Sequence, residues 1–212
     1  MRYKGILFDL DGTLLDTNKL IIESFQHTFK VHYNREVDLD VVRAYFGRPL
    51  RAALEYLGPD KIDELTRTYR EFNAANHDRL TGIFPGVAET IKSLYEQDIR
   101  LAVVTSKMQA RARKGLELFD LEKYFCTIVG CDNCQKHKPD PEPVQRALNE
   151  LGLIGEDCLM IGDSPFDLAS AKAVGVKTAA VRWTEVPWNF LMEENPDYIL
   201  DNIKDLLAIC EI

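Results

Sequence analysis

The sequence lacks long hydrophobic runs and has few cysteines. Its apolar stretches, such as the one inside KGILFDL at residues 4–10, are too short to cross a bilayer. No basic, apolar leader with a small-residue cleavage site opens the chain, so we expect a cytoplasmic protein without a membrane partner. The five cysteines, an odd number at uneven spacing, fit reduced thiols better than a disulfide framework.

Positive charge is also scarce. The 212 residues include 26 Lys and Arg against 34 Asp and Glu, a formal net charge of −8. A nucleic acid or an anionic membrane needs a basic face, so this balance argues against both as partners. A small molecule is therefore the expected partner.

From Pro85 onward, short apolar runs alternate with helical patterns. Residues 101–104, 127–129, 159–161 and 176–181 are predicted strands, and the segments that follow Gly86 and Pro141 place apolar residues on one helical face. This alternation is typical of a parallel sheet covered on both faces. With a first strand at residues 4–8, it predicts an α/β fold: a Rossmann-like, doubly wound sheet of about five strands.

Residues 16–82 interrupt this alternation and are helical in pattern throughout. Asp38 is a predicted N-cap for a helix that carries Val42, Tyr45 and Phe46, and Pro59 is predicted to open another helix. We interpret residues 16–82 as a helical cap inserted into a core of residues 1–15 and 83–212. The joints at residues 14–17 and 80–86 would form its hinge.

Two carboxylates follow the first predicted strand. Side chains two apart on an extended chain point to the same side, so Asp9 and Asp11 should converge where the strand leaves the sheet. They could be ordinary acids of an Asp-Gly turn. However, Asp163 follows another apolar strand, and ligands bind at this edge of open α/β sheets. Three such acids would repel one another without a cation, and hard oxygen ligands favour Mg²⁺.

Other groups expected at the same edge suit a phosphoryl group. Thr105 and Ser106 follow a predicted strand and offer hydroxyl and backbone donors, and Lys138 supplies a fixed positive charge. The amides of Leu10 and the turn after it could hold phosphoryl oxygens, and Gly12 lets the backbone come close.

Four segments resemble, in order, the motifs of haloacid dehalogenase superfamily phosphatases: DLDGT at 9–13, VVTSK at 103–107, HKPDPEP at 137–143 and GDSPFD at 162–167. The position of the inserted helices, between the first two motifs, is similar to that of the family's mobile cap. The stretches TNKLIIESFQHT, KPDPEPVQRAL and VKTAAVRWT resemble the branch that contains phosphoglycolate phosphatases and inorganic pyrophosphatases.

The resemblance implies a role for each acid. Asp9 would attack phosphorus to form an aspartyl phosphate, while Asp11 would protonate the leaving group and later take a proton from water. Asp9, the backbone carbonyl of Asp11 and Asp163 would hold Mg²⁺, and Asp167 would orient them.

It also implies binding roles for neighbouring residues. Thr105 and Lys138 would bind the transferring group, and Lys138 would keep Asp9 ionised. Leu10, Gly12, Thr13 and Ser106 would complete the substrate site.

Two weaker signals each have an ordinary alternative. Arg48 and Arg51 follow the Gly47 turn of the cap and could reach an anionic substrate, or they could be solvated surface arginines. Cys126, Cys131, Cys134 and His137 have a spacing that suggests zinc or redox chemistry, but without a second paired knuckle we interpret them as strand and loop residues.

The sequence thus predicts a Mg²⁺-dependent phosphohydrolase that acts on a small phosphorylated substrate, with inorganic pyrophosphate preferred on resemblance alone. Phosphoglycolate, or another small phosphomonoester, is the alternative substrate. More distant alternatives are a haloacid dehalogenase, which would not need Asp11 or a metal, and a regulator that binds phosphate without turnover.

Overall fold

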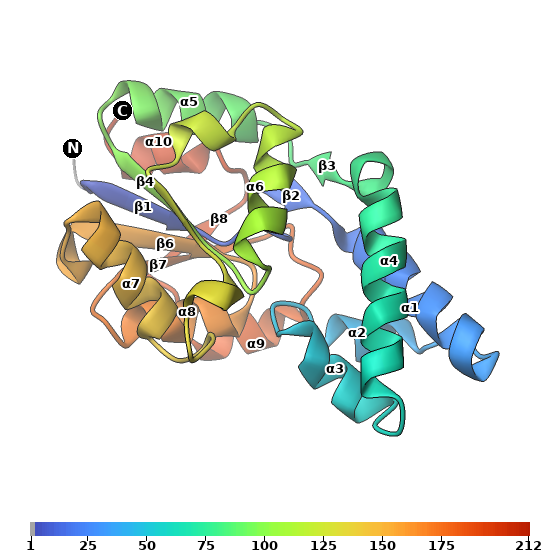
Figure 1. The fold of residues 1–212 in the computed structure, drawn as a ribbon. Helices are drawn as coiled ribbons and strands as arrows, with labels where there is room; N and C mark the ends of the chain where they lie inside the picture. Colours follow the sequence, from blue (N-terminus) through green and yellow to red (C-terminus); the bar gives the residue numbers. More distant parts are fainter. Residues whose placement is uncertain (1–2) are drawn as a thin grey trace.

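A computed structural model describes residues 3–212 (Figure 1). Its main sheet has six strands, and every neighbouring pair is parallel. In spatial order the strands are β5 (Thr127–Val129), β4 (Arg100–Val104), β1 (Gly5–Phe8), β6 (Cys158–Gly162), β7 (Lys177–Val181) and β8 (Tyr198–Leu200). The chain begins at the central strand and extends the sheet to both sides, so the carboxyl end of β1 lies where the strand order reverses.

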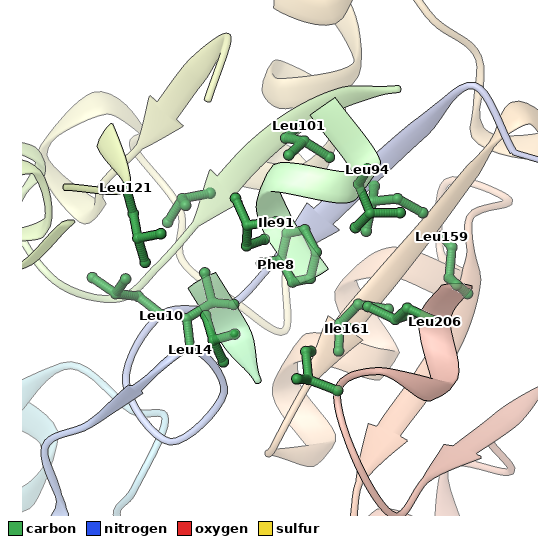
Figure 2. Packing of buried hydrophobic residues seen from close by; sticks show 14 of the residues in the cluster. Phe8, Leu10, Leu14, Ile91, Leu94, Leu101, Leu121, Leu159, Ile161 and Leu206 are labelled. Atoms are coloured by element: carbon green, nitrogen blue, oxygen red, sulfur yellow. The ribbon is translucent and has the colours of Figure 1, made fainter. Parts of the chain in front are cut away.

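Helices cover both faces of this sheet (Figure 1). Along β1, Ile6 and Phe8 belong to the core beneath one helical layer, whereas Leu7 belongs to the core beneath the other. The first layer contains α5 (Val87–Glu96), α6 (Gln109–Glu117) and α10 (Asp205–Ile209), and the second contains α7 (Glu142–Leu151) and α8 (Pro165–Lys172). Figure 2 shows Phe8 beside Ile91 of α5 in the first layer.

The predicted fold class, a doubly wound parallel sheet, is confirmed, with one strand more than expected. The extra strand, β8, has three residues and pairs with β7 from Ala179↔Tyr198 to Val181↔Leu200. The remaining elements of this part are α9 (Trp188–Glu193) and three short 3₁₀ helices at Glu122–Tyr124, Cys131–Asn133 and Gly155–Asp157. Within residues 3–212, no helix has the length and apolar character that a membrane span requires.

Four helices lie between residues 17 and 81 of the chain and stand to one side of the sheet (Figure 1). They are α1 (Asn18–Tyr33), α2 (Leu39–Arg43), α3 (Leu50–Leu57) and α4 (Ile62–Leu80), and α1 packs along α4. Before and after them, β2 (Leu15–Asp16) and β3 (Gly82–Ile83) form a small antiparallel pair. The division into a core and a cap at residues 16 and 82 stays a prediction.

Local signals set some helix ends and missed others. Asp38 caps α2 as predicted, since its carboxylate accepts the amide of Asp40 at 2.9 Å. The prediction that this helix reaches Tyr45 and Phe46 was wrong, because α2 ends at Arg43 and a series of turns follows. The helix expected to open at Pro59 begins at Ile62 instead, and α3 was not predicted.

Candidate active site

The first acidic pair lies directly after the central strand. The amide of Asp9 donates to the carbonyl of Ile161 on β6 at 2.9 Å, which holds Asp9 at the sheet edge. The alternating side chains of Phe8 and Leu10 are fully buried on the core side, and Leu10 lies next to Leu14 in Figure 2. Packing of these apolar neighbours therefore fixes the backbone that carries Asp9.

The loop after Asp9 closes on itself. The Leu10 carbonyl accepts the amides of Leu14 and Leu15 at 3.0 and 2.9 Å, and the Gly12 amide donates to the Leu15 carbonyl at 2.9 Å. Gly12 has φ +86°, and a Cβ there would lie 2.2 Å from Oδ2 of Asp163. Glycine is required at this position by both its backbone conformation and the closeness of the acid.

Lys138 stands among the acids. Its buried ammonium donates to Asp9 Oδ1 at 2.6 Å, to the Val104 carbonyl at 3.0 Å, and to Asp167. All three ammonium hydrogens thus have acceptors, and the cation balances part of the negative charge of the cluster. The predicted meeting of Lys138 with Asp9 is found in the structure.

Asp9, Asp163 and Asp167 form a buried cluster in which one oxygen of each lies within 4.8 Å of the others. Asp167 is fixed by Ser164, whose amide and hydroxyl donate to Oδ2 at 3.1 and 2.7 Å. Oδ1 of Asp163 is buried with no hydrogen-bond partner among the described residues. Such an orphaned carboxylate oxygen needs a donor or a cation.

The electrostatics of the cluster favour a cation as well. Burial raises the pKa of Asp9 to about 7, with Asp167 and Asp11 adding to the rise and Lys138 opposing it. Burial, then Asp9 and Asp167, raises the pKa of Asp163 well above its ordinary value. Burial lowers the pKa of Lys138, but attraction to Asp167 and Asp9 outweighs it and raises that pKa overall. A divalent cation among these oxygens would lower the pKa of both acids.

The Asp11 carboxylate does not join this cluster. Its Oδ1 accepts the Thr17 hydroxyl at 2.9 Å and the Lys107 ammonium at 2.7 Å. Neither Lys107 nor Thr17 was predicted to belong to the site. Lys107 lies inside the VVTSK segment, which was the available signal, but nothing in the sequence alone paired it with an acid 96 positions away.

The other predicted site residues lie around the same edge. Thr105 is buried and its Oγ1 accepts the amide of Lys107 at 3.1 Å. The Ser106 hydroxyl donates to the Gly47 carbonyl at 2.8 Å and so joins the sheet edge to the inserted helices. Thr13 is fully buried, and its hydroxyl has no hydrogen-bond partner in the described chain.

A cavity of about 240 Å³ opens between the inserted helices and the sheet edge. Asp9, Asp11 and Thr105 line it on the sheet side, and Arg48 and Arg51 line it on the helical side. The two arginines predicted to face a substrate are therefore brought to the same space as the acidic pair. Lys138, Asp163 and Asp167 are buried and do not belong to the lining of this cavity.

The cysteines of the described chain form no disulfide and do not belong to the acidic cluster. All five are free thiols, and Cys131 also lines the cavity. Burial and the neighbouring Asp132 raise the pKa of Cys131, which disfavours the reactive thiolate. In the described chain, Asp9, Asp163 and Asp167 are the group of side chains close enough to share a metal ion.

A doubly wound parallel sheet with buried acids at the end of its central strand defines an α/β enzyme with a polar site at the switch point. Comparison with known families makes this specific. The model of the haloacid dehalogenase-like hydrolases matches residues 6–181, so the chain belongs to this family of hydrolases. The resemblance drawn from the four sequence motifs is confirmed.

Comparisons with individual proteins are consistent with this family. Pyrophosphatase PpaX of Halalkalibacterium halodurans is 42% identical over 209 residues, which cover 99% of this chain and 97% of that protein. A haloacid dehalogenase-like family hydrolase from Streptococcus pneumoniae has a similar structure, with a TM-score of 0.89, 27% identity and 99% of each chain covered. A predicted phosphoglycolate phosphatase from Haemophilus somnus, with a TM-score of 0.90, 24% identity and 99% of each chain covered, shares the fold.

Proposed function

We propose that this chain is a magnesium-dependent phosphohydrolase that cleaves inorganic pyrophosphate through a phosphorylated Asp9. The observation that carries the proposal is the Asp9 carboxylate itself, which lines the cavity at the end of the central strand, 2.6 Å from Lys138 Nζ. The full-length likeness to a protein named pyrophosphatase supports pyrophosphate as the substrate.

The donor set fits Mg²⁺. Carboxylates of Asp9 and Asp163, with the carbonyl of Asp11, would hold the ion, and Asp167 would orient them through its bonds to Ser164. Magnesium, when bound, draws charge from the phosphoryl oxygens and makes phosphorus easier to attack.

In the first step an Asp9 oxygen forms a bond to phosphorus while the bond from phosphorus to the leaving phosphate breaks, and that phosphate departs with the electron pair. Lys138 neutralises part of the charge around Asp9, and Thr105, which lines the cavity, binds the transferring group. Asp11 donates a proton to the leaving oxygen. Phosphate is already a good leaving group, so this proton matters less for pyrophosphate than for an alkyl phosphate.

In the second step water attacks the aspartyl phosphate and releases free phosphate and the Asp9 carboxylate. Asp11 takes the proton from the attacking water. Thr17 and Lys107 fix the Asp11 carboxylate in one orientation, so the same side chain is placed for both proton transfers.

Residues 16–82 act in this proposal as a cap that closes over the cavity and excludes water until the aspartyl phosphate has formed. The bond from Ser106 to Gly47 is a contact that opening would break. Hydrogen exchange at residues 14–17 and 80–86 should slow when Mg²⁺ and fluoroberyllate are added. Unchanged hydrogen exchange at these two joints would contradict the proposal that residues 16–82 close as a cap.

Phosphate release tests the reaction. With Mg²⁺ present the protein should release phosphate from pyrophosphate, and excess chelator should stop it. Full turnover in excess chelator would contradict the proposed dependence on a metal ion. A kcat/KM for 2-phosphoglycolate at least ten times that for pyrophosphate, about 1.4 kcal/mol in transition-state binding, would make phosphoglycolate the substrate instead.

A further inference from the structure

The arginines around the cavity differ in how their charges are balanced. Arg51 donates to Glu55 at 3.0 Å and to Asp63 at 3.5 Å, so carboxylates already neutralise it. The Arg48 guanidinium lies over the Phe166 ring, 4.7 Å from its centroid, and so packs against an aromatic face. The two arginines predicted from the sequence therefore already have protein partners.

Two further arginines line the same cavity and were not predicted. Arg70 belongs to α4 and Arg111 to α6. Across residues 3–212, neither guanidinium has a hydrogen bond or an acidic partner. Both line the same cavity, and burial first and then the nearby charge of Arg70 lower the pKa of Arg111. Two cations that repel each other and have no counterion form a site that favours an anion.

The location of the pair is specific. Arg70 and Arg111 line the cavity together with Asp11 and Lys107, and they also line a second, open depression. They therefore stand where this depression adjoins the cavity that Asp9 lines. A volume of about 240 Å³ is below the roughly 300–1,000 Å³ of pockets for drug-sized ligands, so a molecule that reaches both ends must be small.

We infer that Arg70 and Arg111 bind the second anionic group of a small, doubly anionic substrate, the group that Asp9 does not attack. This rests on the proposed phosphoryl transfer at Asp9. In pyrophosphate the second group is the leaving phosphate, and in a phosphorylated acid it is the carboxylate. Both offer paired oxygens that suit a guanidinium.

The arrangement also links binding to closure. α4 belongs to the inserted helices, whereas α6 packs on the sheet, so the two like charges line the cavity from opposite sides of the boundary between them. An anion placed between the guanidinium groups replaces this repulsion with two attractions. Substrates with a second anionic group should therefore hold α4 against α6 better than substrates without one.

The test compares substrates across matched variants. Arg70→Gln and Arg111→Gln should each lower kcat/KM for pyrophosphate about 10- to 100-fold, the effect of losing a charge-assisted contact. For p-nitrophenyl phosphate, which has no second anionic group, the loss should stay below about threefold, because only screened long-range attraction changes.

Controls remove the same charge from the same helices. Arg67→Gln changes an exposed arginine of α4 that lines only the outer depression. Arg113→Gln changes an arginine of α6 that pairs with Glu122 away from the cavity. Both should leave the ratio of the two substrates unchanged.

The outcomes separate the inference from the proposed function. Wild type could cleave 2-phosphoglycolate but not pyrophosphate. If Arg70→Gln and Arg111→Gln then lose phosphoglycolate hydrolysis while they keep p-nitrophenyl phosphate hydrolysis, the proposed substrate is wrong and the proposed anion subsite stands. If both substrates fall equally, if neither falls, or if the controls lose as much, the inference is overturned.

A binding measurement tests the inference even if the protein hydrolyses none of these substrates. Imidodiphosphate with Mg²⁺ should raise the thermal midpoint of wild type more than that of Arg70→Gln or Arg111→Gln. Equal shifts, or no shift in wild type, would overturn the inference.

Discussion

Replacement of Lys138 by methionine tests how the acidic cluster is stabilised. The Lys138 side chain is 1% exposed, and it pairs with Asp9 and Asp167, whose side chains are 6% and 0% exposed. Methionine has similar length but no charge, so the substitution removes the cation and leaves the carboxylates buried together.

The expected cost follows from this burial. Removal of one partner from a buried ion pair costs about 3–5 kcal/mol, because the remaining charge is left uncompensated. Lys4→Met is a matched control, since Lys4 pairs with Asp157 at 3.0 Å on the surface with 69% of its side chain exposed. A surface pair contributes roughly 0–1 kcal/mol.

The cost should depend on pH. Burial raises the pKa of Asp9 to about 7 even with Lys138 beside it, and loss of the cation raises this pKa further. Above about pH 4 the unfolded chain releases protons that the folded variant still binds, so the free energy of unfolding falls as pH rises. The deficit of Lys138→Met relative to wild type should therefore be larger at pH 8 than at pH 5.

Urea unfolding in chelator measures this deficit for wild type, Lys138→Met and Lys4→Met at both pH values. A loss of 3–5 kcal/mol corresponds to roughly 6–20 °C in thermal midpoint for a chain of this size. Added Mg²⁺ should recover part of the deficit, because a bound cation replaces the missing charge. A deficit at pH 8 no larger than that of Lys4→Met would refute the reasoning.

Three further predictions concern the same edge of the sheet. Asp9→Asn should abolish turnover, whereas Asp11→Asn should lose more activity with alkyl phosphates than with pyrophosphate; steady-state kinetics with wild-type rates in Asp9→Asn would contradict the covalent route. Mg²⁺ should raise the thermal midpoint of wild type more at pH 8 than at pH 5.5, because Asp9, with a pKa of about 7, must lose its proton to bind the cation; calorimetry with equal shifts would count against the cluster as the metal site. Gly12→Ala should cost about 1–3 kcal/mol for backbone strain plus the clash with Asp163, and it should reduce the rise in thermal midpoint that Mg²⁺ causes. Gly175→Ala is the control, because Gly175 also has a positive φ, +74°, but a Cβ there would have no atom within 4 Å. In the same scans it should leave the rise caused by Mg²⁺ intact.

The sheet could be predicted because its signals are local. Residues 127–129 were predicted as a strand with the bounds that β5 has, since a short β-branched run between turns is sufficient evidence. β8 was missed because its three residues follow Pro196-Asp197 and become a strand only through pairing with β7. α2 was predicted too long because the apolar spacing continues through Tyr45 and Phe46, which pack in the core without being helical.

The site residues also divide into those with a local sequence signal and those without one. Asp9, Asp11, Thr105 and Asp163 could be placed at one edge because each follows an apolar strand, and parallel strands end together. The bond from Lys107 to Asp11 could not be predicted, since a side-chain direction depends on how β4 and the loop after β1 are set against each other. For the same reason the sequence pointed to Arg48 and Arg51 and gave no reason to prefer Arg70 and Arg111, which meet only across the assembled cavity.

The small antiparallel pair of β2 and β3 has a consequence for protein engineering. Asp16 lies opposite Gly82, so the chain leaves the sheet and returns to it through neighbouring positions. A two-residue Asn-Gly turn could join these positions as an ordinary hairpin, and residues 17–81 could be excised or exchanged without a change of register. Such a graft would uncover Leu168 and Leu191, which pack against the inserted helices, so a replacement module must supply its own apolar face there. The backbone is thus permissive to exchange, and compatibility is decided by the buried surface.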